Sequence, residues 1–145
     1  MKNYVLFCAG IIVCVLAFMS FDADSQSFAG ENPKNSKLAV VWTSGDRDVA
    51  ERVCFMYVHN AKKAGWFDRV EIIVWGPSAK LLSEDAALQK KVKKMMKDGV
   101  TINACKACAD SYGVSGKLSE LGIEVKYMGA PLSNMLKNDI KVLTF

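Results

Sequence analysis

Short apolar segments rich in β-branched residues alternate with stretches of helical periodicity, and this alternation constrains the fold more than any other feature. The apolar segments are KLAVVWT, RVEIIVW, VTINA, IEVKYM and IKVLTF, at residues 37–43, 69–75, 100–104, 123–128 and 140–145. Continuous apolar strands are typical of a parallel sheet that is buried on both faces. The sequence therefore predicts an α/β fold with three layers, α/β/α, around a mainly parallel sheet of about five strands.

The segments between these strands have helical spacing. Apolar residues recur every three or four positions from Val49 to Ala61, and again from Leu88 to Met96, where lysines occupy the opposite face. Ser78 follows a Gly-Pro break and is a candidate helix cap. Shorter helices are expected at 109–113, 115–121 and 131–138.

The N-terminal stretch MKNYVLFCAGIIVCVLAFMSF has one charged residue, Lys2, before a long apolar run. This layout is typical of a secretory signal, here cleaved after Ala29 or near Ser27. The alternative is a retained membrane anchor, because a run of about 18 apolar residues approaches the length that spans a bilayer. We expect a signal peptide or anchor at 1–29, a linker at 30–36 and one domain at 37–145. The domain is then periplasmic or secreted, or held at a membrane.

Composition excludes several classes of protein. Hydrophobic residues make up 51% of the chain and charged residues 23%, which is typical of a globular domain. The formal net charge of +4 does not indicate nucleic acid as a partner, and none is expected. One Cys-x-x-Cys supplies two of the four ligands of a structural zinc, and His59 is the only histidine. We therefore expect neither a metal nor a cofactor.

The predicted sheet brings several loops to one edge. Ligands of open parallel sheets bind outside the carboxyl ends of the strands. The segments TSGD, WGPS, CKAC and MGAP follow successive strands and fall at that edge. Their residues that turn the chain or offer polar groups are candidates for substrate binding: Thr43, Ser44, Gly76, Pro77, Lys106 and Gly129.

Cys105 and Cys108 are the candidate catalytic residues. Cys105 ends a strand and precedes a helix beside Lys106, so backbone N–H groups, the helix dipole and a cation favour its thiolate. Cys108 lies one turn later and is expected to lean toward Cys105 or toward the core. The alternative is that both are incidental small apolar residues. Cys54 falls on the apolar stripe of a helix and is interpreted as core packing.

At these residues the chain resembles the DsrE/DsrF-like family of small sulfur-relay proteins. The resemblance rests on GVTINACKACADSYGV (99–114), VWGPSAKLL (74–82) and LGIEVKYMGAPL (121–132), and it extends over 37–145. It implies a parallel sheet with helices on both faces and a homo-oligomer, a trimer or a hexamer. It also implies that the cysteine at the place of Cys105 carries sulfur as a persulfide. Cys108 places the chain in an exported subgroup with a Cys-x-x-Cys motif.

Different classes of function remain open. The first is a sulfur carrier that holds sulfane sulfur on Cys105 and passes it to a partner thiol; the sequence does not identify the donor or the acceptor protein. The second is a non-enzymatic oligomeric binding module with a structural or redox-active cysteine pair, and a thiol oxidoreductase is a third. Self-association is also favoured by apolar residues that we expect to be exposed, namely Trp66, Phe67, Met95 and Met96.

Overall fold

The structure is a computed structural model that describes residues 35–138 and 140–145. The predicted signal or anchor at 1–29 and most of the linker lie outside the described residues. Residues 31–145 form a compact unit by themselves. Within the described ranges, no helix is both long enough and apolar enough to cross a bilayer.

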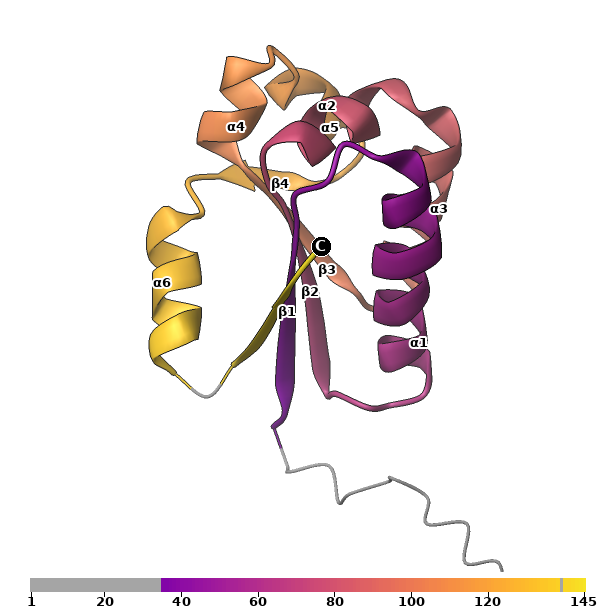
Figure 1. The fold of residues 1–145 in the computed structure, drawn as a ribbon, viewed down its shortest axis with the longest axis vertical. Coiled ribbons are helices and arrows are strands. Elements are labelled where there is room, and N and C mark those ends of the chain that lie inside the picture. The colour runs from indigo at the N-terminus through magenta and orange to yellow at the C-terminus, as the bar shows by residue number, and fades with distance from the viewer. Residues whose placement is uncertain (1–34, 139) are drawn as a thin grey trace, which may run out of the picture. The chain divides into compact units, whose positions relative to one another are not determined.

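The strands form one parallel sheet in the order β4-β3-β2-β1-β5 (Figure 1). Their bounds are β1 Lys37–Trp42, β2 Arg69–Val74, β3 Thr101–Cys105, β4 Glu124–Lys126 and β5 Lys141–Thr144. The predicted α/β fold is confirmed. β4 is shorter than the apolar segment 123–128 suggests, because Tyr127 is exposed and Met128 turns toward the next helix.

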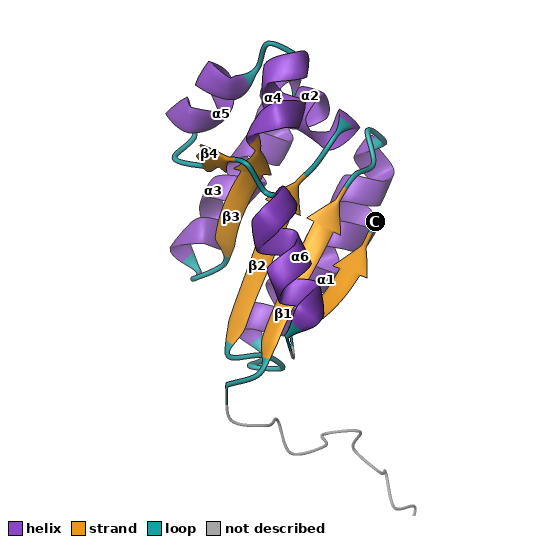
Figure 2. Ribbon diagram, turned by 90° about the vertical axis from the view of Figure 1, so that its left-hand side faces the viewer, coloured by secondary structure: helices purple, strands orange, loops and turns teal. Residues whose placement is uncertain are grey.

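Helices cover the sheet on its two faces. The helices are the π-helix η1 Val49–Phe55, α1 Met56–Lys63, α2 Pro77–Glu84, α3 Ala86–Lys97, α4 Lys106–Ser111, α5 Ser115–Glu120 and α6 Gly129–Lys137. α6 lies on one face, with α1 and α3 on the other (Figures 1 and 2). The shorter helices α2, α4 and α5 gather at the carboxyl ends of the strands (Figure 2). This edge is therefore the one at which the sequence places the candidate site.

Each face of the sheet has its own hydrophobic core. On the α1 and α3 side, alternate strand residues such as Trp42, Ile72 and Ala104 join the larger core. On the α6 side, a smaller core contains Val41, Ile73, Cys105 and Met128. Because side chains alternate along a strand, the step from Ala104 to Cys105 moves the chain from the larger core to the smaller one.

The first helical segment differs from the expected regular spacing. It begins as a π-helix, whose wider turn brings residues five apart onto one side. Phe55 is therefore buried together with Ala50, whereas Val53, expected on the apolar stripe, is 41% exposed. The predicted exposure of Met95 is wrong, because this side chain is buried in the larger core. Trp66 is exposed as expected.

Candidate functional site

Cys105 is the last residue of β3 and the residue that precedes α4. Its side chain is 3% exposed and lies in the smaller core with Val41, Ile73 and Met128. β3 is an inner strand, between β2 and β4. Cys105 therefore lies at the carboxyl end of a strand, as the sequence predicted. Its sulfur faces apolar side chains and not open solvent.

Cys108 lies one turn into α4 and is half-buried. Its thiol donates a hydrogen bond to the sulfur of Cys105, and its own sulfur accepts one from the backbone N–H of Gly76. Burial and the bond to Cys105 raise the pKa of the Cys108 thiol, and the Gly76 amide partly opposes this rise. Both cysteines are free thiols. Cys108 therefore contacts both Cys105 and the turn that precedes α2.

Gly76 precedes α2 with φ 68° and ψ −133°, a backbone conformation that residues with a side chain rarely adopt. The turn is fixed by Ser78, which is buried and does not cap the helix as the sequence suggested. Its hydroxyl donates to the carbonyl of Trp42 at 2.5 Å and accepts from the N–H of Trp75 at 3.0 Å. Ser78 thus ties the ends of β1 and β2 together and holds the Gly76 amide at Cys108.

Lys106 directs its ammonium away from this hydrogen-bonded pair. Its Nζ lies 2.6 Å from Asp110 and 5.9 Å from the ring centre of Tyr127. The hydrogen bond to Asp110 raises the pKa of Lys106, and the pKa of Asp110 is lowered by Lys106 and by Ser115. The cation is thus engaged with a carboxylate, and its role in binding a substrate stays a prediction.

Thr43 and Ser44 lie at the end of β1, and β2 separates that strand from β3. The Thr43 hydroxyl donates to the Phe145 carbonyl at 2.8 Å, and the N–H groups of Thr43 and Ser44 donate to the same oxygen. Their hydrogen bonds therefore join the end of β1 to β5. The two residues do not reach the cysteines, and their proposed contact with a substrate stays a prediction.

The remaining candidates frame the site from neighbouring loops. Pro77 opens α2, and a Cβ built on Gly45 would lie 3.2 Å from its Cβ, so the TSGD and WGPS loops touch. Gly129 opens α6 directly after Met128, which is fully buried against the Cys105 core. The sequence analysis named Gly129 but missed Met128. The position of Met128 at the end of an apolar segment could have indicated that its side chain is buried.

A sequence model of the DsrE/DsrF-like family matches residues 36–145, which contain the whole described sheet and both cysteines. The chain belongs to the DsrE/DsrF-like family. Among solved structures, it is similar to the conserved protein of unknown function BT1422 from Bacteroides thetaiotaomicron. The identity is 40% and the TM-score 0.74, over 77% of this chain and 96% of that chain.

The ychN protein from E. coli shares the fold at 17% identity, with a TM-score of 0.59 over 76% of this chain and 99% of that chain. No curated protein sequence matches this chain. The comparisons thus show a DsrE-like domain that accounts for nearly the full length of its solved relatives.

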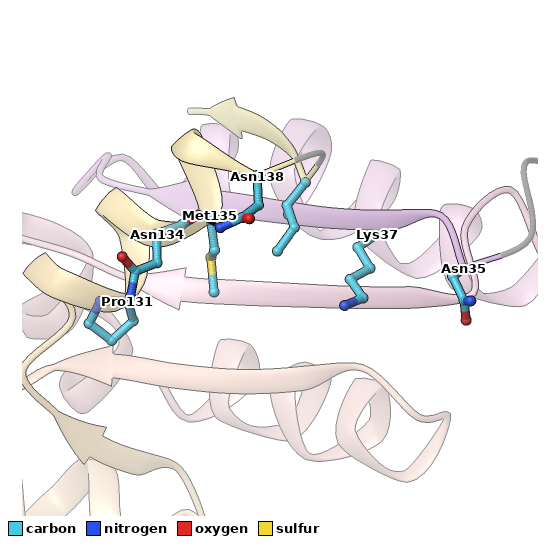
Figure 3. Close-up of a pocket in the computed structure, with 7 residues that line it drawn as sticks. Asn35, Lys37, Pro131, Asn134, Met135 and Asn138 are labelled. Atoms are coloured by element: carbon cyan, nitrogen blue, oxygen red, sulfur yellow. Dashed lines mark hydrogen bonds between the residues drawn. The ribbon is translucent and has the colours of Figure 1, made fainter.

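A groove in this DsrE-like domain lies on the α6 face, away from the thiols. It has a volume of about 370 Å³, and its lining includes Lys37, Pro131, Asn134 and Met135. Figure 3 shows Lys37 and Met135 extending from β1 and α6 into the space between them. This groove is lined by neither cysteine.

Other titratable groups lie outside the site. Cys54 is fully buried in the larger core, as the sequence predicted, and burial raises its pKa to about 12. His59 is half-buried and lies 2.5 Å from Asp98. Among the described residues, no group of three or more His, Cys, Asp or Glu side chains is arranged to hold a metal ion.

Proposed function

We propose that this DsrE-like protein carries sulfane sulfur as a persulfide on Cys105 and passes it to a thiol of a partner protein. The observation that carries the proposal is the position of Cys105 at the carboxyl end of β3, directly before α4 and beside the Cys108 thiol. The thiolate of a cysteine is the nucleophile in sulfur transfer. Family membership supports a place in sulfur relay in general.

The transfer has two balanced steps. The Cys105 thiolate attacks the outer sulfur of a donor persulfide, which forms a new S–S bond to Cys105 and releases the donor as its thiolate. An acceptor thiolate then attacks the outer sulfur of the Cys105 persulfide. This step forms the acceptor persulfide and restores the Cys105 thiolate. Neither step changes the total number of electrons, so no cofactor is needed.

Cys108 adds a competing reaction. Its sulfur can attack Cys105 Sγ in the persulfide, which gives the Cys105–Cys108 disulfide and one sulfide ion or H₂S. Cys108 is bonded to Gly76 and is half-buried, and its raised pKa keeps it a thiol, which slows this attack. A reductant must return the disulfide to the dithiol before another cycle. In an oxidising compartment, where we propose the mature domain works, this trapped state accumulates.

The test is mass spectrometry after exposure of the full chain to polysulfide, with an alkylating reagent to trap persulfides. Trypsin cleavage at Lys106 separates the two cysteines into peptides 98–106 and 107–117. We expect the mass of one added sulfur on peptide 98–106. Cys105→Ser should lose this adduct, Cys108→Ser should hold it longer, and Cys54→Ala, the control with a buried thiol removed, should retain it. An adduct on peptide 107–117 that survives in Cys105→Ser would contradict the proposal.

The burial of Cys105 favours a second candidate function. A side chain that is 3% exposed suits a structural cysteine pair in an oligomeric binding module. We propose a homo-oligomer in either case, as the family resemblance implies. In the binding-module case, polysulfide gives no adduct on either peptide while the protein remains folded and oligomeric by light scattering. The same digest therefore separates the two functions.

A further inference from the structure

A line of cations crosses the edge of the sheet that is opposite to Cys105. Lys37 and Arg69 are paired at the first register position of β1 and β2. Lys141 opens β5 and is paired with Leu38, one residue further along β1. Each of these basic residues begins a strand, whereas Cys105 ends one. Three neighbouring strands therefore present positive charge at their amino ends.

The C-terminal ends of two helices extend this line. α1 ends with Lys62 and Lys63, and the Lys62 Nζ donates to the Asp68 carbonyl at 3.0 Å. A Cβ built on Gly99, in the turn after α3, would lie 3.0 Å from the Lys62 Cε, so the ends of α1 and α3 are adjacent. We call the resulting surface the basic edge; it comprises Lys37, Lys62, Lys63, Arg69, Lys97 and Lys141.

Acidic side chains offset only part of the positive charge of the basic edge within the described residues. Glu71 lines a groove together with Lys37 and Arg69, and it accepts a hydrogen bond from the Asn103 amide at 2.7 Å. Asp68 accepts a hydrogen bond from the N–H of Ser36 at 2.9 Å. Asp98 is bonded to Lys94 at 3.0 Å and to His59 at 2.5 Å. Neither carboxylate forms an ion pair with a basic-edge residue in this part of the chain. The surface is left with an excess of positive charge.

An aromatic side chain stands among these cations. Trp66 lies in the turn between α1 and β2 and is 50% exposed, with its ring 6.0 Å from that of Tyr57. Its neighbours along the chain are Lys62, Lys63 and Arg69. An exposed indole beside several cations matches the interface of an anionic bilayer, where tryptophan favours the headgroup level and basic side chains attract anionic lipids.

We propose that the basic edge docks on an anionic phospholipid surface with Trp66 entering the headgroup region. The described chain also enters β1 at this edge, and the sequence before it leads back to the apolar residues 4–21. Where residues 1–29 are retained as the anchor, this connection favours a membrane over another polyanion, because an apolar segment and a basic surface are two signals that together anchor a protein. Docked in this way, the domain holds the Cys105 edge away from the lipid.

The test uses residues 31–145, because they form a compact unit. The solved structure of BT1422 supports this choice, since 96% of its chain matches this domain and it therefore has little beyond it. Binding is measured by sedimentation with vesicles of phosphatidylcholine alone and of equal parts phosphatidylcholine and phosphatidylglycerol. We expect binding to the mixed vesicles only. Because each basic side chain contributes about fivefold at an anionic surface, Lys63→Gln with Lys97→Gln should weaken binding about 25-fold.

The matched control also removes two lysine charges, but outside the basic edge. Lys80 of α2 and Lys117 of α5 are exposed near the carboxyl ends of the strands (Figure 2), and the double glutamine variant should bind within about twofold of the unmodified domain. Tryptophan emission should shift to shorter wavelength on binding, and Trp66→Phe should abolish that shift. Equal binding to uncharged vesicles, equal losses in the two double variants, or tighter binding to single-stranded DNA than to mixed vesicles would overturn the proposal.

Discussion

The backbone N–H of Gly76, in the turn before α2, donates a hydrogen bond to the sulfur of Cys108 in α4. This bond joins the turn after β2 to the turn after β3. It requires the Gly76 peptide to stay in its positive-φ conformation. The position of the Cys108 thiol therefore depends on a backbone group in the turn after β2. Substitutions in that turn should change the reactivity of the cysteines.

Gly76→Ala should destabilise the domain by about 1–3 kcal/mol, because a side chain is strained at φ 68° and ψ −133°. Relaxation of the turn should also remove the amide from Cys108 and raise the pKa of that thiol further. Urea unfolding measures the first effect, and the pH dependence of Cys108 alkylation measures the second. Gly116→Ala is the control, since Gly116 lies in α5 without a positive φ and should be neutral or slightly stabilising. Equal stability of the two variants would refute the strain argument.

Ser78→Ala should lower the free energy of unfolding by about 1–2 kcal/mol, because the buried hydroxyl is lost and the Trp42 carbonyl and Trp75 N–H keep only their bond to each other. Ser83→Ala is the matched control. Ser83 is also buried, but its hydroxyl bonds only to the Lys80 carbonyl within the same helix, at 2.8 Å. Chemical denaturation should show a smaller loss of stability for Ser83→Ala than for Ser78→Ala, because fewer hydrogen bonds are removed. A larger loss for Ser83→Ala would show that Ser78 does not hold the turn.

Cys54 should make the folded state less stable at alkaline pH. Its thiol ionises near 9.0 when unfolded but near about 12 when buried, so above pH 9 the unfolded chain loses a proton that the folded chain keeps. This contribution to stability is complete below the unfolded pKa and is lost as the pH rises toward the folded pKa. Between about pH 9 and about pH 10.5, the unmodified protein should lose about 1.6 kcal/mol more than Cys54→Ala. Parallel stability curves for the two proteins would contradict this assignment.

Met128→Ala should expose the Cys105 sulfur, because Met128 is fully buried in the smaller core beside it. We expect a stability loss of about 2–5 kcal/mol and faster alkylation of peptide 98–106. Leu136→Ala provides the control: Leu136 lies in α6, the helix that Met128 precedes, but is 64% exposed and should change stability by less than about 0.5 kcal/mol. Identical alkylation rates in both variants would mean that Met128 does not limit access to Cys105.

The sheet was predictable from the sequence because strands buried on both faces must be apolar throughout, as KLAVVW and EIIV are. The same logic placed Cys105 at the carboxyl end of a strand. The burial of Phe55 was not predictable, because a π-helix changes which residues share a side, and nothing in the periodicity signals it. The cap of α3 was missed as well: Asp85 accepts from the N–H groups of Ala87 and Leu88.

Within the site, sequence spacing identified both cysteines but not what they contact. The bond from Gly76 to Cys108 joins residues of different turns, and only the packing of α2 against α4 brings them together. The contacts of Lys106 were not predictable either. Its position next to Cys105 suggested a charge at the sulfur, yet a carboxylate one helical turn away, on Asp110, takes its ammonium. Adjacency along the chain says little about where a long side chain ends.

The strand order has a consequence for the time course of folding. β1 pairs with β2 nearby in sequence, but its other neighbour is β5, and Thr43 bonds to a carbonyl 102 residues further along the chain. Contacts of such long sequence separation form slowly, because a large loop must close before they contribute. During synthesis, β1 has one exposed edge until residues 141–144 have emerged. A nascent chain of this topology therefore stays incompletely folded until its last strand has been made.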